Sequence, residues 1–203
     1  MADGMEGIDV AAVTAWFADR VENLVTPLNF ELLAGGHSNL TYLVTDGAGR
    51  SYVLRRPPLG HVLQSAHDMG REHKIISALQ GSSVPVATTV DLCTDHSVND
   101  APFYVMDYVA GPVLHDHDAA ADLSEDNRES LGLHVIDVLS ALHKIDPDTV
   151  GLGDLGRKEA YLQRQMKRWV TQWEATKTHG VPAMDESTRL LAERMPEQVG
   201  CSI

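Results

Sequence analysis

The spacing of hydrophobic residues predicts a helix near the start of the chain. Apolar side chains recur there at intervals of three and four, as on one face of a helix: Val10, Val13, Phe17 and Val21. Asp9 precedes them and suits an N-cap, because its carboxylate can accept hydrogen bonds from free backbone amides. We therefore expect an amphipathic helix from Asp9 to about Val25.

The hydrophobic period then shortens to that of strands. Three short β-prone runs follow, around residues 30–32, 41–44 and 52–54, and the sequences GGHSN and DGAG lie between them. Turn-forming Gly, Asn and Asp between such runs are typical of antiparallel hairpins. The pattern predicts a three-stranded meander, which ends at Arg55-Arg56-Pro57-Pro58.

One helix and two more strands complete the first half of the predicted fold. Helical spacing returns from about residue 66 to 79, and strand-like runs cover about 88–93 and 103–109, joined by a polar turn. We expect five short strands with one inserted helix. Residues 1–109 would form this lobe.

The second half is predicted to be helical. Ser124 can cap a helix whose face carries Leu131, Val135 and Leu142, and further helices are expected over about 157–178 and from near 185 to before Pro196. The fold class is therefore α+β, with a five-stranded antiparallel sheet followed by helices. Residues 110–203 would form the second, incomplete helical lobe.

Composition narrows the functional classes. Hydrophobic residues make up 43% of the 203 positions, as in an ordinary globular protein of one domain or two lobes. Because 29 acidic residues outnumber 16 basic ones, the net charge of -13 disfavours binding to nucleic acid or to anionic lipid surfaces. No apolar run approaches the roughly 20 residues of a membrane span, and the N-terminus is acidic where a signal peptide would be basic. Cys93 and Cys201 have no CxxC spacing, so we expect a reduced, cytoplasmic protein.

Several motifs in order resemble the small lobe of a protein kinase. The segment LAGGHSN, which includes Gly35, Gly36, His37, Ser38 and Asn39, is similar to the phosphate-covering loop of the aminoglycoside phosphotransferase family. The resemblance implies that Gly36, Ser38 and Asn39 cover the terminal phosphates of ATP. The alternative is a tight hairpin whose glycines supply positive φ angles.

The next two motifs are a cation and an acid. Arg55 stands where kinases carry the strand-three lysine, and the resemblance implies that it binds the α- and β-phosphates. Arginine retains that role because it is always charged and can bind phosphate through two N–H groups. Glu72 resembles the helix acid that pairs with this cation. The alternative is that Arg55 and Arg56 only form a solvated strand end.

The segment FYVMDYVAG, residues 103–111, resembles the fifth strand and the hinge between the kinase lobes. By position, Met106 would guard the adenine pocket, and the Asp107 carbonyl and the Val109 N–H would face the adenine edge. The alternative is an ordinary buried strand.

The helical half resembles the kinase domains fused to some acyl-CoA dehydrogenases. The similarity lies in ALHKID, GLGDLGR, YLQRQ and RWVTQWE, between residues 141 and 174. Five of the 16 basic residues fall between 157 and 168, with aromatic residues among them. We expect Tyr161, Arg164, Arg168 and Trp169 to contribute to a site for an anionic small-molecule acceptor such as a coenzyme A thioester. A packed helix with a solvated basic face is the alternative.

The chemistry of phosphoryl transfer also needs a base and ligands for Mg²⁺, which the family takes from a His-Gly-Asp-type loop and a later Asp. No residue of this sequence matches them. His115-Asp116-His117-Asp118 follows the hinge too closely to be that loop, and we assign it neither catalysis nor a metal. The resemblance implies an ATP-dependent small-molecule phosphotransferase whose nucleotide-binding lobe this chain supplies, and we expect the 203 residues alone to be catalytically inactive. The alternative is an inactive remnant or a nucleotide-binding or regulatory fragment. Unpartnered apolar helix faces are expected to favour self-association.

Overall fold

The computed structural model describes residues 5–34, 39–60, 67–114 and 116–200. Helix α1 (Val10–Ala18) is capped by Asp9, whose Oδ1 accepts a hydrogen bond of 3.0 Å from the Ala12 N–H. The prediction that this helix continues to Val25 is wrong. The chain turns soon after Ala18, and Asn23 takes a left-handed conformation with φ of 55°.

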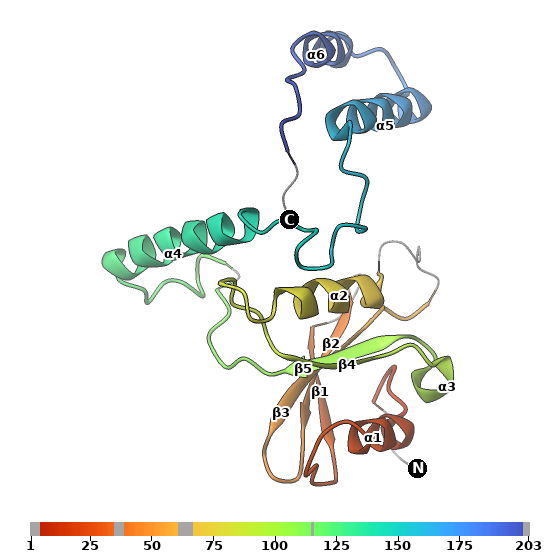
Figure 1. Cartoon of the computed structure of the whole chain (residues 1–203), viewed down its shortest axis with the longest axis vertical. Helices are drawn as coiled ribbons and strands as arrows, with labels where there is room; N and C mark the ends of the chain where they lie inside the picture. Colours follow the sequence, from red (N-terminus) through yellow and green to blue (C-terminus); the bar gives the residue numbers. More distant parts are fainter. Residues whose placement is uncertain (1–4, 35–38, 61–66, 115, 201–203) are drawn as a thin grey trace. The chain divides into compact units, whose positions relative to one another are not determined.

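Five antiparallel strands form one sheet in the order β1-β2-β3-β5-β4 (Figure 1). Their bounds are β1 Asn29–Ala34, β2 Leu40–Thr45, β3 Ser51–Arg56, β4 Thr89–Cys93 and β5 Phe103–Asp107. This confirms the predicted α+β class and the meander of the first three strands. Strand β5 ends before the predicted Val109 because its pairing with β3 stops where Asp107 lies opposite Tyr52.

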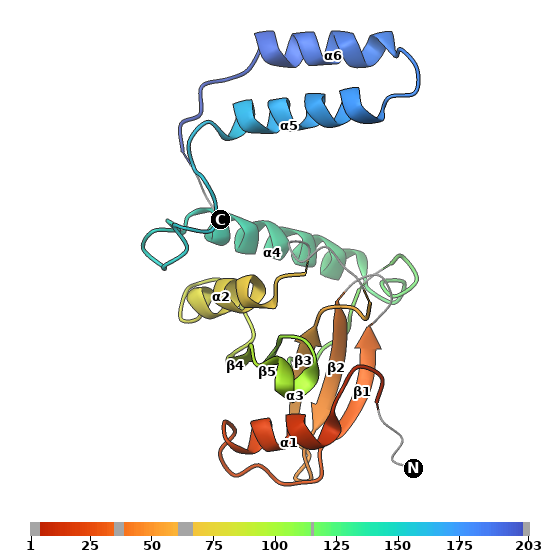
Figure 2. The same ribbon diagram turned by 90° about the vertical axis from the view of Figure 1, so that its right-hand side faces the viewer.

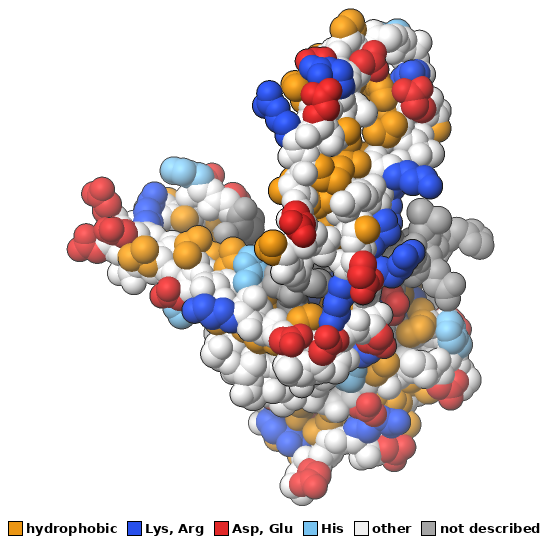
Figure 3. All heavy atoms as spheres, turned by 45° about the horizontal axis from the view of Figure 1, so that its top comes forward, with side chains coloured by type: hydrophobic (Ala, Val, Ile, Leu, Met, Phe, Trp, Pro, Cys, Tyr) orange, Lys and Arg blue, Asp and Glu red, His pale blue; other side chains and the backbone are white. Residues whose placement is uncertain are grey.

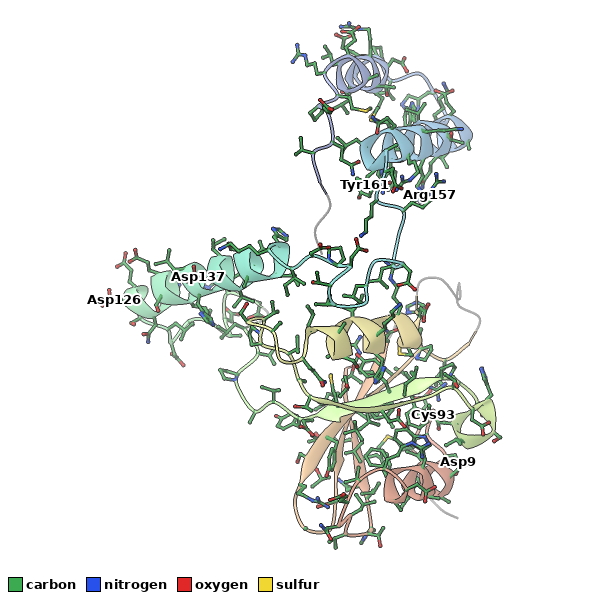
Figure 4. The ribbon with its side chains drawn as sticks, viewed as in Figure 1. Asp9, Cys93, Asp126, Asp137, Arg157 and Tyr161 are labelled. Atoms are coloured by element: carbon green, nitrogen blue, oxygen red, sulfur yellow. The ribbon has the colours of Figure 1, made fainter. Side chains whose placement is uncertain are left out.

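One face of the sheet carries the main hydrophobic core. Alternate strand residues such as Tyr42, Leu54 and Val105 point to it, and Val13 and Phe17 of α1 pack against them. The four-residue helix α3 (His96–Asn99) contacts α1, and both lie on this face (Figure 2). Cys93 is buried in the same cluster (Figure 4).

Helix α2 (Met69–Leu79) covers the opposite face and contacts β4 and β5 (Figure 1). Since side chains alternate along a strand, Arg55 on β3 and Tyr104 on β5 point to this second face. The sheet thus separates a packed core from a face that carries polar side chains. The candidate site lies on the latter.

Three longer helices follow: α4 (Glu125–His143), α5 (Tyr161–Thr176) and α6 (Pro182–Glu193). Ser124 caps α4 as predicted, its Oγ accepting from the Asn127 N–H at 3.2 Å. The chain divides into two compact units, residues 1–142 and 143–203. The boundary that we predict after Val109 follows the expected hinge and stays a prediction.

Candidate nucleotide site

Arg55 and Glu72 form an ion pair on the α2 face of the sheet. The Arg55 Nε lies 3.3 Å from the Glu72 Oε2, and the two side chains are 31% and 33% exposed. The geometry is that of an ionic contact and not of an aligned hydrogen bond, so the Arg55 Nε has no hydrogen-bond partner within the described part of the chain. The structure therefore brings together the cation and the acid that the resemblance pairs, and leaves part of the guanidinium open to solvent.

Two neutral donors hold the Glu72 carboxylate. The Asn39 Nδ2 donates to Oε1 at 2.6 Å, and the Tyr104 hydroxyl donates to Oε2 at 3.1 Å. Asn39 lies just before β2 and Tyr104 is on β5, so residues distant in sequence converge on α2. Glu72 itself sits in the first turn of α2, a position that favours an acid because of the exposed amides there.

Asn39 extends this cluster to His67. Because its amide nitrogen is directed at Glu72, its Oδ1 is the acceptor for the His67 Nδ1, 2.6 Å away. This assigns the proton of the imidazole to Nδ1. The prediction that Asn39 covers terminal phosphates stays a prediction; its side chain contacts Glu72 and His67 in the structure.

Tyr104 is buried beneath α2. Burial raises the pKa of its phenol above the usual range, and the Glu72 carboxylate acts in the same direction, while the nearby Arg55 lowers it. The phenol therefore stays protonated and can only donate its proton to Glu72. The ring of His73 contacts Tyr104 edge-on, with 6.0 Å between the centroids.

The predicted hinge lies at the end of β5. Met106 is half-buried, whereas Asp107 and Val109 are exposed. The Asp107 N–H donates to the Thr88 carbonyl at 2.8 Å, which holds this segment against the chain that leads into β4. No contact with adenine is tested by this geometry, so the roles of Met106, Asp107 and Val109 stay predictions.

The predicted phosphate-covering loop and the predicted solvated strand end have different outcomes. Most of the loop lies outside the described residues, namely Gly35, Gly36, His37 and Ser38. Arg56 lies within them and is only 5% exposed, and its guanidinium donates to the carbonyls of Gly7 and Pro57. The alternative of a solvated strand end is therefore wrong for Arg56, which points to the face opposite Arg55.

The predicted acceptor residues lie on or near one side of α5. Tyr161, Arg164 and Arg168 are spaced by three and four residues, and the side chains of Tyr161 and Trp169 are 51% and 60% exposed. Arg157 and Tyr161 lie near the start of α5 (Figure 4), and Arg164 donates to the Arg157 carbonyl. Figure 3 shows hydrophobic side chains open to solvent beside charged ones in this part of the chain.

The resemblance implies Mg²⁺ for a complete family member, but the residues that the structure describes do not fit that ion. Among them, no group of three or more His, Cys, Asp or Glu side chains could hold a metal ion. His115 is outside the described residues, and His117 and Asp118 are fully solvated. We derive no metal-dependent step for this chain. In the described part of the chain, no helix has the length and the apolar character needed to cross a membrane.

Sequence reasoning missed Tyr104 and His67. Tyr104 stands inside the hinge-like segment that we interpret as a strand, but its relation to Arg55 depends on β3–β5 register, which places the two residues directly opposite. Side chains alternate along β5, but which of them share a sheet face with Arg55 is known only once that register is known. His67 carries no local signal, because its partner is 28 positions away.

An antiparallel five-stranded sheet with a cation on the third strand, paired with an acid on the following helix, defines the small lobe of a kinase-like phosphotransferase. The sequence profile of the phosphotransferase enzyme family (APH) matches residues 29–201. The chain belongs to this family.

Similar proteins agree with the assignment. The chain is 36% identical over 163 residues to mouse acyl-CoA dehydrogenase family member 10 and 34% identical over 169 residues to chicken acyl-CoA dehydrogenase family member 11. These matches cover 80% and 83% of this chain but only 15% and 21% of the relatives, so the chain spans about a fifth or less of their length.

Solved structures show the same fold. A candidate aminoglycoside phosphotransferase from Ralstonia eutropha JMP134 superposes with a TM-score of 0.79 at 34% identity, covering 94% of this chain and 54% of that protein. The GDP complex of aminoglycoside 2'-phosphotransferase-IIIa superposes with a TM-score of 0.62 at 18% identity, covering 92% and 59%. The second match supports the fold alone.

Proposed function

We propose that this chain supplies the nucleotide-binding lobe of an ATP-dependent kinase for a small molecule. The observation that carries the proposal is the Arg55–Glu72 ion pair on the α2 face of the sheet, in a chain of the phosphotransferase family. ATP would supply the phosphoryl group. Arg55 would bind the α- and β-phosphates, and Glu72 would hold Arg55 in place.

The test is ADP binding by the purified chain, measured by titration calorimetry. We expect Arg55→Ala to weaken ADP binding about tenfold or more, because a charge-assisted contact to phosphate is lost. Arg71→Ala is the matched control, since Arg71 is an exposed arginine one position before Glu72. Equal ADP affinity of the Arg55→Ala variant and the unaltered chain would contradict the assignment. The same titration with GDP distinguishes the two purines.

We further propose an anionic acceptor, such as a hydroxyacyl-coenzyme A thioester. The basic and aromatic side chains on α5 support this class, as do the acyl-CoA dehydrogenases among the relatives. The reversal Arg164→Glu/Arg168→Glu is expected to reduce the affinity for 3-hydroxybutyryl-coenzyme A about tenfold and to leave ADP binding unchanged.

The control for charge is Lys144→Glu/Arg194→Glu, which changes the net charge equally at exposed positions outside α5. Equal thioester affinity in the α5 variant, the control and the unaltered chain would favour a solvated basic face.

Transfer itself would break the bond from the γ-phosphorus to the bridging oxygen and form one to the acceptor oxygen, with the hydroxyl proton passing to a base. We assign that base to no residue here. Because no base is assigned, we expect ADP binding without turnover from the 203 residues alone, and detectable phosphoryl transfer by the purified chain would contradict this expectation.

A further inference from the structure

Glu72 is held by more contacts than an ion pair with Arg55 requires. Its Oε1 accepts a hydrogen bond from Asn39 at 2.6 Å, and its Oε2 accepts one from Tyr104 at 3.1 Å while lying 3.3 Å from the Arg55 Nε. Each carboxylate oxygen therefore has its own neutral donor. One donor lies on β5 and the other just before β2, and both approach the carboxylate independently of Arg55.

Tyr104 has the geometry of a rigid support. It lies directly opposite Arg55 in the β3–β5 register and is only 1% exposed. A buried hydroxyl that loses its acceptor cannot recover a hydrogen bond from water, so rotation of Glu72 away from Tyr104 carries a desolvation penalty. The hydroxyl thus restricts Glu72 to the rotamer that faces Arg55.

Asn39 acts on the other oxygen. Its Oδ1 accepts from the His67 Nδ1, which fixes the amide plane and directs Nδ2 at Glu72. The contact joins the start of β2 to the first turn of α2. An amide held at both ends is a directional donor, in contrast to a freely rotating one.

We propose that Tyr104 and Asn39 are positioning residues, which hold the two oxygens of Glu72 and through them aim the Arg55 guanidinium at the diphosphate of a bound nucleotide. This inference rests on the proposed function, because it assigns Arg55 to phosphate. It gives Tyr104 and Asn39 a role that they exert through Glu72, and for Asn39 this role is separate from the predicted contact with the terminal phosphates.

The test is a double-mutant cycle read out by ADP affinity of the full chain. Tyr104→Phe removes only the hydroxyl, and we expect it to weaken ADP binding about threefold to tenfold when Arg55 is present. In the Arg55→Ala background the same change should alter affinity by less than about twofold, because the group being positioned is gone. Asn39→Ala is the second variant and should follow the same pattern.

Tyr52→Phe is the matched control. Tyr52 is also buried in the sheet, but it packs against Phe17 on the opposite face, so it should leave ADP affinity unchanged. Equal weakening by Tyr104→Phe with and without Arg55, or no weakening when Arg55 is present, would overturn the positioning role alone. Failure of the unaltered chain to bind ADP at millimolar concentration would overturn the proposed function and this inference with it.

Discussion

At the scale of single residues, polar contacts concentrate on two acids with different tasks. Glu72 is partly exposed and accepts contacts from β3, from β5 and from the residue before β2, which suits a group that orders a binding site. Asp46, in contrast, is buried in the turn between β2 and β3, and the donors to its carboxylate lie in that turn. Its Oδ1 accepts from the N–H groups of Ala48 and Arg50, each at 2.9 Å.

Asp46 makes the stability of the fold depend on pH. Burial alone would raise its pKa, but hydrogen bonds from Arg50 and Ala48 outweigh burial and hold the pKa below the ordinary value. Because the pKa of Asp46 is lower in the folded chain, the unfolded chain takes up the proton first as the pH falls. The contribution of Asp46 to the free energy of unfolding is therefore complete above about pH 4 and is lost as the pH falls through the folded pKa. We expect Asp46→Asn to lower the urea midpoint at pH 7 and to flatten its decline between about pH 5 and 3.

The measurement is urea unfolding at several pH values. Asp122→Asn is the control, since Asp122 is exposed. Parallel decline of the Asp46→Asn variant and the unaltered chain would show that other acids govern the acid sensitivity.

At the scale of elements, α2 links the sheet to the candidate site, and its first turn decides how well Glu72 is fixed. Asp68 caps the helix, its Oδ1 accepting from the Arg71 N–H at 2.9 Å. We expect Asp68→Ala to reduce the free energy of unfolding by about 1 kcal/mol, because helix amides lose their acceptor. Fraying of this turn would loosen Glu72, so ADP affinity should fall with it.

Asp68→Ser provides the rescue, since serine also caps helices well. It should recover most of the lost stability and ADP affinity, measured by urea unfolding and calorimetry. If Asp68→Ala leaves the urea midpoint unchanged, the cap contributes little to α2.

Hydrophobic periodicity predicted those elements whose own residues determine their structure. The first three strands and α2 alternate or repeat apolar positions, so local pattern suffices. Helix α3 was missed because four residues contain no helical period; it is held from afar, with the Asn99 side chain accepting from the Asp9 N–H at 2.9 Å. Likewise Arg55 and Glu72 could be named by resemblance, whereas Tyr104 required the strand register. Contacts between segments that are distant in sequence could not be predicted from local patterns.

At the scale of the whole molecule, the two compact units differ in how much they bury. Nearly all buried hydrophobic side chains lie in residues 1–142, where Trp16 packs against Phe103 with 4.9 Å between ring centroids. In residues 143–203, Leu152 is buried, but α5 and α6 bury none of their side chains. Since apolar burial is the main stabilising contribution, the second unit should be the less stable.

The three tryptophans allow this to be measured, because Trp16 reports on the first unit and Trp169 and Trp173 report on α5. We expect the fluorescence of a Trp169→Phe/Trp173→Phe variant to change at a urea concentration about 1 M or more above that of a Trp16→Phe variant. Circular dichroism of both variants should show the earlier step as a loss of helix, with the sheet retained. Coincident midpoints would instead mean that the chain unfolds as one cooperative unit, and that the second unit is stabilised by more than its own buried surface.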